Sequence, residues 1–165
     1  GCTDGYGSDL WKHFAELGLT GICIPEDQGG LGLGAVEAAL VLEEVGRNLT
    51  PSPFLMTAVV GAKAIAGTTH ADRWYPGILS GDAVLALAVD ECRRHAPEET
   101  ALTAERRGNG FVLNGSKQFV VQGNSADVLL TVARTAGSPG DRKGLTLFAV
   151  PKGAAKVESV TLADS

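Results

Sequence analysis

A glycine-rich segment is the first place where residue types and spacing suggest ligand chemistry. Residues 21–34 read GICIPEDQGGLGLG and precede a segment of helical periodicity. Glycines before a helix let backbone N–H groups approach a pyrophosphate, so dinucleotide binding has to be weighed. Against it, Pro25-Glu26-Asp27 place acidic groups where phosphate would approach, and a hairpin pattern follows instead of a parallel strand ending in an acid. We interpret the segment as a tight connection between helices, in which glycines allow close packing.

The other reactive side chains do not form a metal or nucleophile motif. Asp27 lacks the alternating oxygen ligands, and the acid at the twelfth position, that a calcium loop requires. Cys2, Cys23 and Cys92 have neither CxxC nor zinc-ligand spacing, and Cys23 lies in an apolar run typical of a small core residue. Glu16 and Glu91 are carboxylates that could serve as a catalytic base, and we assign them to surface or structural roles. We therefore predict no metal site, and the odd number of cysteines favours a reduced, cytoplasmic setting.

Composition sets further bounds on function. The chain has 165 residues, 44% of them hydrophobic, and a net charge of −5, so no basic surface for nucleic acid or an anionic membrane is expected. The longest weakly polar stretch, residues 54–67, is interrupted by Lys63 and is too short to cross a bilayer. No signal peptide is recognised at the beginning of the chain. Gly1 is not a natural start, so we expect a cut, processed or incompletely recorded N-terminus.

Helical periodicity runs through the first half of the chain. Leu10, Trp11, Phe14 and Leu17 recur at three- and four-residue steps, with Ser8 placed to cap the helix and Gly18 to end it. Further helices are predicted at residues 35–47, where Gly46 marks the end, from Pro53 towards Gly67, and at residues 71–75, before Pro76. We expect a helical domain over residues 1–80.

The second half carries strand and turn patterns instead. We predict strands at residues 84–89, a hairpin over residues 102–113, a tight turn at Asn114-Gly115 into a buried strand containing Lys117 and Phe119, and strands at residues 128–134 and 144–150. Strands without intervening helices favour a small antiparallel sheet or barrel over a doubly wound fold. The predicted fold class is α+β, with an antiparallel β domain over residues 81–165.

Several stretches, each weak alone, resemble the acyl-CoA dehydrogenase family when taken in order. They are residues 14–21 (FAELGLTG), Ile24-Pro25-Glu26, residues 29–32 (GGLG), residues 43–47 (EEVGR), residues 75–82 (YPGILSGD), residues 112–117 (VLNGSK), Ala126-Asp127-Val128 and residues 146–150 (TLFAV). Together they cover nearly the whole chain, which is on this basis identified as a member of the family.

The resemblance implies a fold and an activity. Members combine an N-terminal helical domain, a middle β domain and a C-terminal four-helix domain around FAD and an acyl thioester. A glutamate removes the α proton, which the polarised thioester carbonyl acidifies, while the β hydride passes to the flavin. The implied partners are an acyl-CoA substrate, an electron-transferring flavoprotein or similar acceptor, and further subunits in a homo- or hetero-tetramer. The chain ends at Ser165, inside the expected β domain, so the family's usual catalytic glutamate is absent and we assign no catalytic residue.

The resemblance also places the cofactor-binding residues, and two of them depart from the family. FAD is expected beside Leu87, Val89, Asp90, Phe119 and Val121. Asp90 replaces a threonine at the flavin pyrimidine edge; it can accept a hydrogen bond from N3–H, but an ionised carboxylate there repels the charge of reduced flavin. Phe119 suits the face of the flavin ring, whereas Val121 has no side-chain donor for N5. From the residues alone, Phe119 and Val121 are equally explained as inward positions of a core strand.

A further departure affects phosphate binding. Arg93-Arg94-His95 and Ala96-Pro97-Glu98 replace the family's glycine-serine turn, which meets phosphate oxygens. The arginines are candidates for a substitute phosphate contact, and a solvated loop is the alternative.

Two functional hypotheses, with a weaker third, follow. The first is an FAD-dependent acyl-CoA dehydrogenase that desaturates an acyl-CoA thioester once a C-terminal domain completes it. The second is a catalytically silent, flavin-poor partner subunit of a heteromeric dehydrogenase, suggested by Asp90, Val121 and the lost glycine-serine turn. An oxygenase on the same scaffold is the third.

Overall fold

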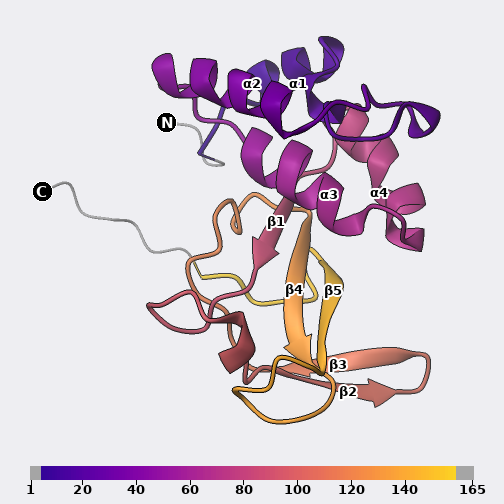
Figure 1. Ribbon diagram of the computed structural model, residues 1–165, viewed down its shortest axis with the longest axis vertical. Helices are drawn as coiled ribbons and strands as arrows, with labels where there is room; N and C mark the ends of the chain where they lie inside the picture. The colour runs from indigo at the N-terminus through magenta and orange to yellow at the C-terminus, as the bar shows by residue number, and fades with distance from the viewer. Residues whose placement is uncertain (1–4, 159–165) are drawn as a thin grey trace, which may run out of the picture.

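The helices form one layer and the strands extend from it as a second (Figure 1), and the computed structural model describes residues 5–158. The helical elements are α1 (Ser8–Glu16), η1 (Leu19–Gly21), η2 (Glu26–Gln28), α2 (Ala35–Arg47), η3 (Leu55–Gly61), α3 (Ala62–Ile65), α4 (Thr69–Leu79) and, between strands, η4 (Pro97–Glu99). The strands are β1 (Leu85–Ala88), β2 (Thr103–Arg107), β3 (Gly110–Asn114), β4 (Val128–Arg134) and β5 (Leu145–Pro151). The predicted order of a helical unit followed by a β unit is confirmed.

The first two helices match their predicted ranges, and their ends differ in detail. Gly18 follows α1 with a φ of 76°, a left-handed conformation that ends the helix as predicted. The N-cap is Gly7 rather than Ser8, and its helix start has no side-chain cap. Helix α2 covers the predicted residues 35–47, with Gly46 inside its last turn, and the left-handed residue beyond its end is Leu49.

The prediction that Pro76 ends the fourth helix is wrong. Helix α4 runs from Thr69 to Leu79 with Pro76 inside it. Proline removes one backbone donor, a cost that tertiary packing can offset. Here Ile78, beyond the proline, is fully buried, and the Tyr75 hydroxyl donates to the Ala62 carbonyl oxygen at 2.9 Å. The packed last turn holds α4 together past the proline.

A π-helical segment joins the helical layer to the sheet. The predicted third helix is present, but its first part, η3, has π-helical hydrogen bonding, a geometry often found at functional sites. Within it, the buried Thr57 hydroxyl accepts from Leu85 N–H at 3.0 Å and lies 3.1 Å from the Leu85 carbonyl oxygen, to which it donates. Gly61 allows this approach, since a Cβ there would lie 2.9 Å from Leu85 Cβ. Thr57 thus occupies the place of a neighbouring strand beside β1.

The sheet is mixed, which corrects the expectation of an antiparallel one. Strand β4 pairs antiparallel with β5 along its whole length, from Val128↔Pro151 to Arg134↔Leu145. On its other edge β4 pairs parallel with β1 and then, through Thr103↔Arg134, parallel with the start of β2. Parallel neighbours require a long connection between them. Residues 89–127, which include the hairpin β2–β3, connect β1 to β4, and residues 108–127, which include β3 and the loop after it, connect β2 to β4.

The predicted buried strand after Asn114-Gly115 is also wrong. Among the described residues 115–127 none belongs to a strand. Phe119 and Gln122 have φ values of 54° and 64°, in the left-handed region that an extended strand does not contain. Phe119 is 70% exposed and Val121 57% exposed, so neither is an inward position of a core strand. The segment is a loop that lies beside the end of β1.

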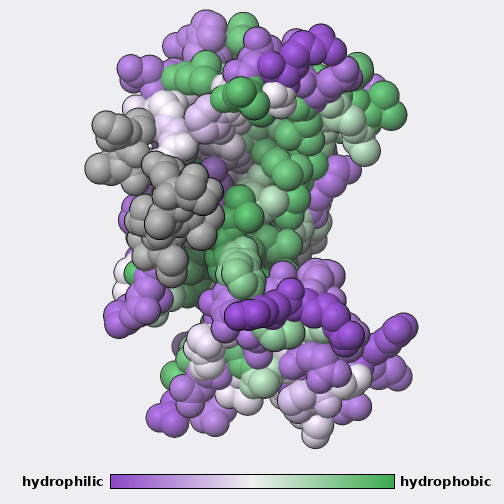
Figure 2. Space-filling view, turned by 90° about the vertical axis from the view of Figure 1, so that its left-hand side faces the viewer, coloured by the Kyte–Doolittle hydropathy of each residue, from purple (hydrophilic) through white to green (hydrophobic). Residues whose placement is uncertain are grey.

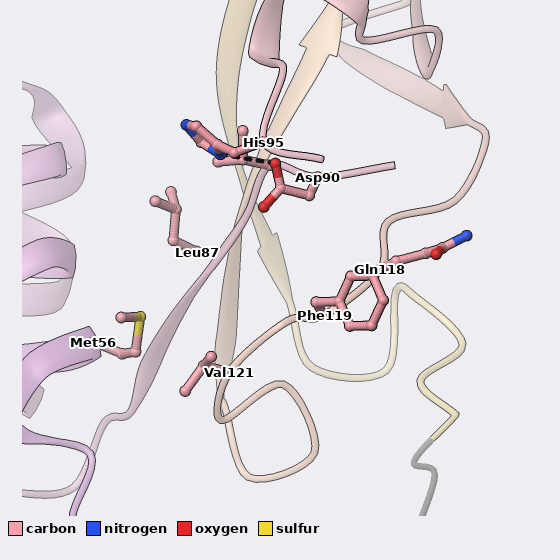
Figure 3. A pocket seen from close by; sticks show the side chains of 8 residues that line it. Met56, Leu87, Asp90, His95, Gln118, Phe119 and Val121 are labelled. Atoms are coloured by element: carbon pink, nitrogen blue, oxygen red, sulfur yellow. Dashed lines mark hydrogen bonds and ion pairs between the residues drawn. The ribbon is translucent and has the colours of Figure 1, made fainter. Parts of the chain in front are cut away.

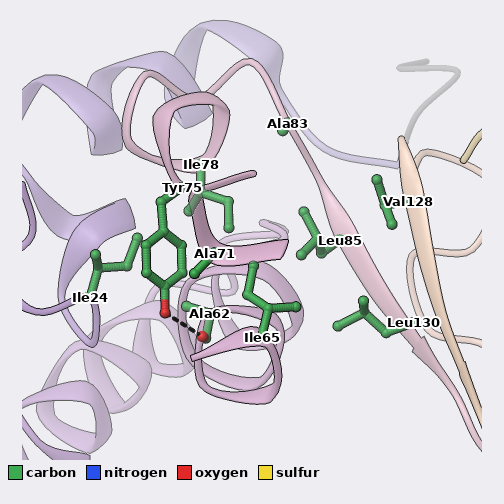
Figure 4. Packing of buried hydrophobic residues seen from close by; sticks show 10 residues of the cluster. All are labelled: Ile24, Ala62, Ile65, Ala71, Tyr75, Ile78, Ala83, Leu85, Val128 and Leu130. Atoms are coloured by element: carbon green, nitrogen blue, oxygen red, sulfur yellow. Dashed lines mark hydrogen bonds between the residues drawn. The ribbon is translucent and has the colours of Figure 1, made fainter. Parts of the chain in front are cut away.

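The two layers share one hydrophobic core. Figure 4 shows its side chains, contributed by both helices and strands: Ile24, Ala62, Ile65, Ala71, Tyr75, Ile78, Ala83, Leu85, Val128 and Leu130. A second cluster around Trp11 and Phe54 lies within the helical layer, and Cys23 packs against it half-buried. Burial raises the pKa of the Cys23 thiol, which fits its predicted role as a core residue. Within residues 5–158 no helix is long and apolar enough to cross a bilayer.

We predict that Thr57→Val lowers the free energy of unfolding by about 2–4 kcal/mol, measured by urea denaturation. Valine keeps the shape of threonine but leaves the buried Leu85 N–H and carbonyl group without the hydroxyl. Thr103→Val, at an exposed strand position, is the control and should change stability by less than about 0.5 kcal/mol. Equal effects of the two substitutions would contradict the role given to Thr57.

Candidate functional site

A pocket of about 170 Å³ lies where the helical layer meets the loops that follow β1 and β3 (Figure 3). Its lining residues are Met56, Leu87, Val89, Asp90, His95, Gln118, Phe119 and Val121. On the face shown in Figure 2, a band of hydrophobic surface continues from the helical layer onto the strand layer. The pocket therefore belongs to the junction of the two layers.

One wall of the pocket is apolar and comes from three separate segments. Met56 projects from η3, Leu87 from β1, and Phe119 and Val121 from the loop after β3 (Figure 3). Val89 extends the same wall beyond the end of β1. A large aromatic side chain that is 70% exposed, on a residue with positive φ, is a costly arrangement that clusters at ligand sites. The wall suits a planar, largely apolar ring.

The opposite edge is polar. His95 Nδ1 lies 2.8 Å from Asp90 Oδ1, and Gln118 N–H donates to the Asp90 carbonyl oxygen at 2.7 Å. The Asp90 side chain is 29% exposed and that of His95 70% exposed. In Figure 3 the other carboxylate oxygen of Asp90 faces the space between Leu87 and Phe119. This edge offers a hydrogen-bond acceptor to a ring that carries an N–H group.

All five residues predicted to contact a cofactor line this pocket. Leu87, Val89, Asp90, Phe119 and Val121 come from two segments about thirty residues apart in sequence and meet around one space. Their contact with a cofactor stays a prediction. Arg93 and Arg94, the candidate phosphate contacts, are exposed on the same loop and do not line the pocket.

A buried ion pair fixes the two segments that carry these residues. Lys117 Nζ lies 2.7 Å from Glu91 Oε1 and donates to the Val89 carbonyl oxygen at 2.8 Å. The Lys117 side chain is only 6% exposed and that of Glu91 20% exposed. The two oxygens of Glu91 also accept from Ala101 N–H at 2.8 Å and Leu102 N–H at 3.0 Å. Three chain segments therefore meet at one carboxylate.

These contacts determine how Glu91 ionises. Burial alone raises the pKa of the carboxyl group, but the hydrogen bonds from Lys117, Ala101 and Leu102, with the charge of Lys117, outweigh burial and hold it below the usual value. A carboxylate whose oxygens are occupied and whose pKa is lowered is a poor proton acceptor. The structural role predicted for Glu91 is consistent with this geometry.

Arg134 fixes the far side of the same loop. The side chain is buried and donates only to carbonyl oxygens, from Nε to Thr100 at 2.9 Å and from its terminal nitrogens to Glu98, Lys143, Asp141 and Ala136. The planar guanidinium suits such a fan of acceptors. Residues 97–102 are thus held by Arg134 at one end and by Glu91 at the other.

Sequence reasoning missed Lys117, His95, Met56 and Gln118 as parts of the site. The sequence held a signal for Lys117, because a lysine among buried residues needs a carboxylate partner, and Glu91 was a carboxylate already assigned to a surface or structural role. His95 gave no such signal, since its contact with Asp90 depends on the turn between them. Met56 lies in the helical half, and nothing in its surroundings indicates that η3 faces the end of β1.

We predict that Lys117→Met destabilises the protein by about 3–5 kcal/mol, because it leaves the Glu91 carboxylate buried without its counter-charge. Chemical denaturation measures the change. Lys143→Met removes the charge of an exposed lysine and should cost less than about 0.5 kcal/mol. A small effect at Lys117 would mean that the pair is dispensable.

The lowered pKa of Glu91 predicts a pH dependence. A carboxyl group with a lowered pKa in the folded state contributes stability that is fully present above its ordinary value of 4.5 and is lost as pH falls through the lower folded value. The stability gap between wild type and Glu91→Gln should therefore be constant above that pH and shrink below it. Glu105→Gln, exposed on β2, should give a small gap at every pH. A gap at Glu91 that grows in acid would contradict the assignment.

Comparisons with known proteins agree with this arrangement. Residues 3–82 match the family description "Acyl-CoA dehydrogenase, N-terminal domain" and residues 95–164 match "Acyl-CoA dehydrogenase, middle domain". Isovaleryl-CoA dehydrogenase of Pongo abelii is 33% identical over 153 residues, which are 88% of this chain and 36% of that protein. The chain thus spans a little over a third of the curated relatives it matches.

Solved structures show the same likeness. One titled "Tcur3481-Tcur3483 steroid ACAD" is 30% identical, with a TM-score of 0.76 over 87% of this chain and 38% of that one. The ChsE4-ChsE5 complex from Mycobacterium tuberculosis is 29% identical, with a TM-score of 0.74 over 90% of this chain and 39% of that one. The chain belongs to the acyl-CoA dehydrogenase family, and its helical layer followed by a mixed sheet is the fold of that family's N-terminal and middle domains.

Proposed function

We propose that this chain forms the flavin-binding part of an FAD-dependent acyl-CoA dehydrogenase that desaturates an acyl-CoA thioester, once a C-terminal helical domain completes it. The observation that carries the proposal is the meeting of Leu87, Val89, Asp90, Phe119 and Val121 around one pocket in a chain of this family. Two separate segments supply these residues, so their convergence depends on the fold and not on proximity in sequence.

The residues of the pocket fit a flavin ring. The apolar wall of Met56, Leu87 and Val121 suits the flat face of a large ring, and the exposed Phe119 side chain can stack or pack at its edge. The carboxylate of Asp90 suits a ring N–H group. When bound, FAD supplies the group that accepts the hydride, and the protein supplies orientation and electrostatics.

In this proposal the chain's own residues orient the ring and exclude water. The apolar wall removes solvent from one side of the ring, which strengthens the polar contacts at its edge. Val121 has no side-chain donor, so it contributes apolar contact and, at most, its backbone N–H. We assign the base that removes the α proton to the C-terminal domain, because the family resemblance implies it and because Glu91 is committed to Lys117 and to two backbone amides. The proposal also includes three partners: an acyl-CoA as substrate, an electron-transferring flavoprotein or similar protein as electron acceptor, and further subunits in a tetramer.

The second candidate is a catalytically silent subunit that pairs with a flavin-binding homologue. The family resemblance puts Asp90 at the pyrimidine edge of the flavin and Val121 near N5. These two residues favour the second candidate, because a carboxylate repels a reduced flavin and valine has no side-chain donor for N5. One structure similar to this chain, the ChsE4-ChsE5 complex from Mycobacterium tuberculosis, is by its name an assembly of two differently named chains. The two candidates differ in whether this subunit holds its own FAD.

The test is flavin stoichiometry and turnover of the purified full-length protein, alone and with homologous subunits. The leading proposal expects one FAD per subunit and reduction of an artificial electron acceptor on addition of an acyl-CoA, with product analysis showing the α,β-unsaturated thioester. A folded protein without FAD, which restores activity only to a homologous partner, would support the second candidate and contradict the first. An oxygenated product would show that neither candidate describes the reaction.

We also predict that Phe119→Leu weakens FAD binding about tenfold or more, because it removes an aromatic contact worth about 1 kcal/mol beyond the loss of area. Fluorescence titration of the apoprotein with FAD measures the affinity. Phe111→Leu changes another exposed aromatic residue, on β3 and outside the pocket lining, and should leave FAD affinity unchanged. Equal affinities for wild type and Phe119→Leu would remove Phe119 from the site.

A further inference from the structure

We propose that His95 is a charge-compensating positioning residue, which holds Asp90 against the polar edge of the flavin and offsets its negative charge when the flavin is reduced. The inference rests on the proposed flavin site and deepens it. It answers the difficulty that a bare carboxylate raises at this edge, where it would repel a reduced ring.

The geometry carries the proposal. His95 Nδ1 and Asp90 Oδ1 are 2.8 Å apart, and both residues line the pocket. The bond uses one oxygen of the carboxylate, while the other faces the space between Leu87 and Phe119 (Figure 3). Gln118 N–H fixes the backbone of Asp90 at the same time, at 2.7 Å from its carbonyl oxygen. Asp90 is therefore held from its side chain and its main chain.

The pair changes what a ligand meets at this edge. A protonated imidazole beside the carboxylate makes the pair neutral overall, whereas a neutral imidazole leaves a net negative charge. A neutral pair still presents the free oxygen of Asp90 as an acceptor for a ring N–H. It no longer imposes a full negative charge on a ring that gains electrons. In this proposal His95 offsets the charge of Asp90, which replaces the neutral threonine that the family resemblance implies at this position.

The other charged residues next to the pair in sequence are either paired with an opposite charge or exposed. Glu91, next in sequence to Asp90, is held by Lys117, and these two charges offset each other at 2.7 Å. Arg93 and Arg94 are exposed on the same loop. The remaining described residues that line the pocket, from η3, β1 and the loop after β3, carry no charge. His95 is the lining residue whose side chain directly contacts the Asp90 carboxylate.

The experiment compares the full-length protein loaded with FAD with its His95→Gln and Asp90→Asn variants and the double variant. Glutamine keeps hydrogen-bonding capacity without the charge. The readout is the flavin reduction potential, from dye equilibration, between about pH 6 and about pH 9, the range over which an ordinary imidazole loses its proton. His70→Gln, an exposed histidine on α4, is the control.

Near pH 6 we expect His95→Gln to lower the affinity for reduced flavin relative to oxidised flavin about tenfold, a fall of about 30 mV for a two-electron couple. The difference from wild type should vanish towards pH 9, and it should be smaller in the Asp90→Asn background, where the imidazole has lost its carboxylate. A purely structural role for His95 would change FAD affinity without this dependence on pH and on Asp90.

Two results would overturn the inference, and they are distinguishable. If the wild type binds FAD and its potential matches that of His95→Gln across the pH range, the inference fails while the proposed function stands. If the folded wild type binds no FAD, the flavin site itself is wrong, and the inference falls with it. His70→Gln should match the wild type in either case.

Discussion

The candidate site depends above all on the contact between Glu91 and Lys117. A lysine side chain that is 6% exposed can remain charged only beside a partner, and the carboxylate of Glu91 is that partner at 2.7 Å. Because the carboxylate also accepts from Ala101 and Leu102, it ties the end of β1, the start of β2 and the loop after β3 to one point. The pocket residues Val89 and Asp90 directly precede Glu91 in the chain, and Gln118 and Phe119 directly follow Lys117. A buried charge pair of this kind adds less to net stability than to specifying one arrangement of the segments, a role we assign to it here as a hypothesis.

The helical layer supplies the opposing constraint. Thr57 replaces a strand neighbour beside Leu85, and the close approach of Gly61 lets η3 lie directly against β1. The turn that places Thr57 towards the strand also places Met56 in the pocket. Helices and sheet share a core here, so the position of the pocket is set by packing between layers and by hydrogen bonding within the sheet. The absence of a strand at residues 115–127 then frees Phe119 to face the pocket.

Much of this fold was predictable from local pattern. The periodicity of residues 35–47 and 128–134 gave α2 and β4 with their bounds, because apolar spacing and flanking turns agree there. The prediction of a strand around Lys117 was wrong, although the sequence there alternates like a strand. The ion pair of Lys117 with Glu91 and the left-handed conformations of Phe119 and Gln122 hold this segment in a loop instead. The prediction that the fourth helix ends before Pro76 was wrong for a similar reason. Burial of Ile78 stabilises the last turn by more than the one backbone hydrogen bond that proline removes. The five predicted site residues came from family resemblance, whereas Lys117 and His95 depend on contacts that only the folded chain reveals.

Hydrogen exchange tests most directly whether the Glu91–Lys117 contact holds these segments together. The amides of Ala101 and Leu102 bind Glu91, and that of Gln118 lies one residue beyond Lys117. In Lys117→Met the account predicts that exchange speeds up most at these three amides, and less at amides paired between β4 and β5, which lose only the protection given by global stability. If the three amides stay as protected as in the wild type, or if protection is lost uniformly across the sheet, the contact does not act as the local junction described.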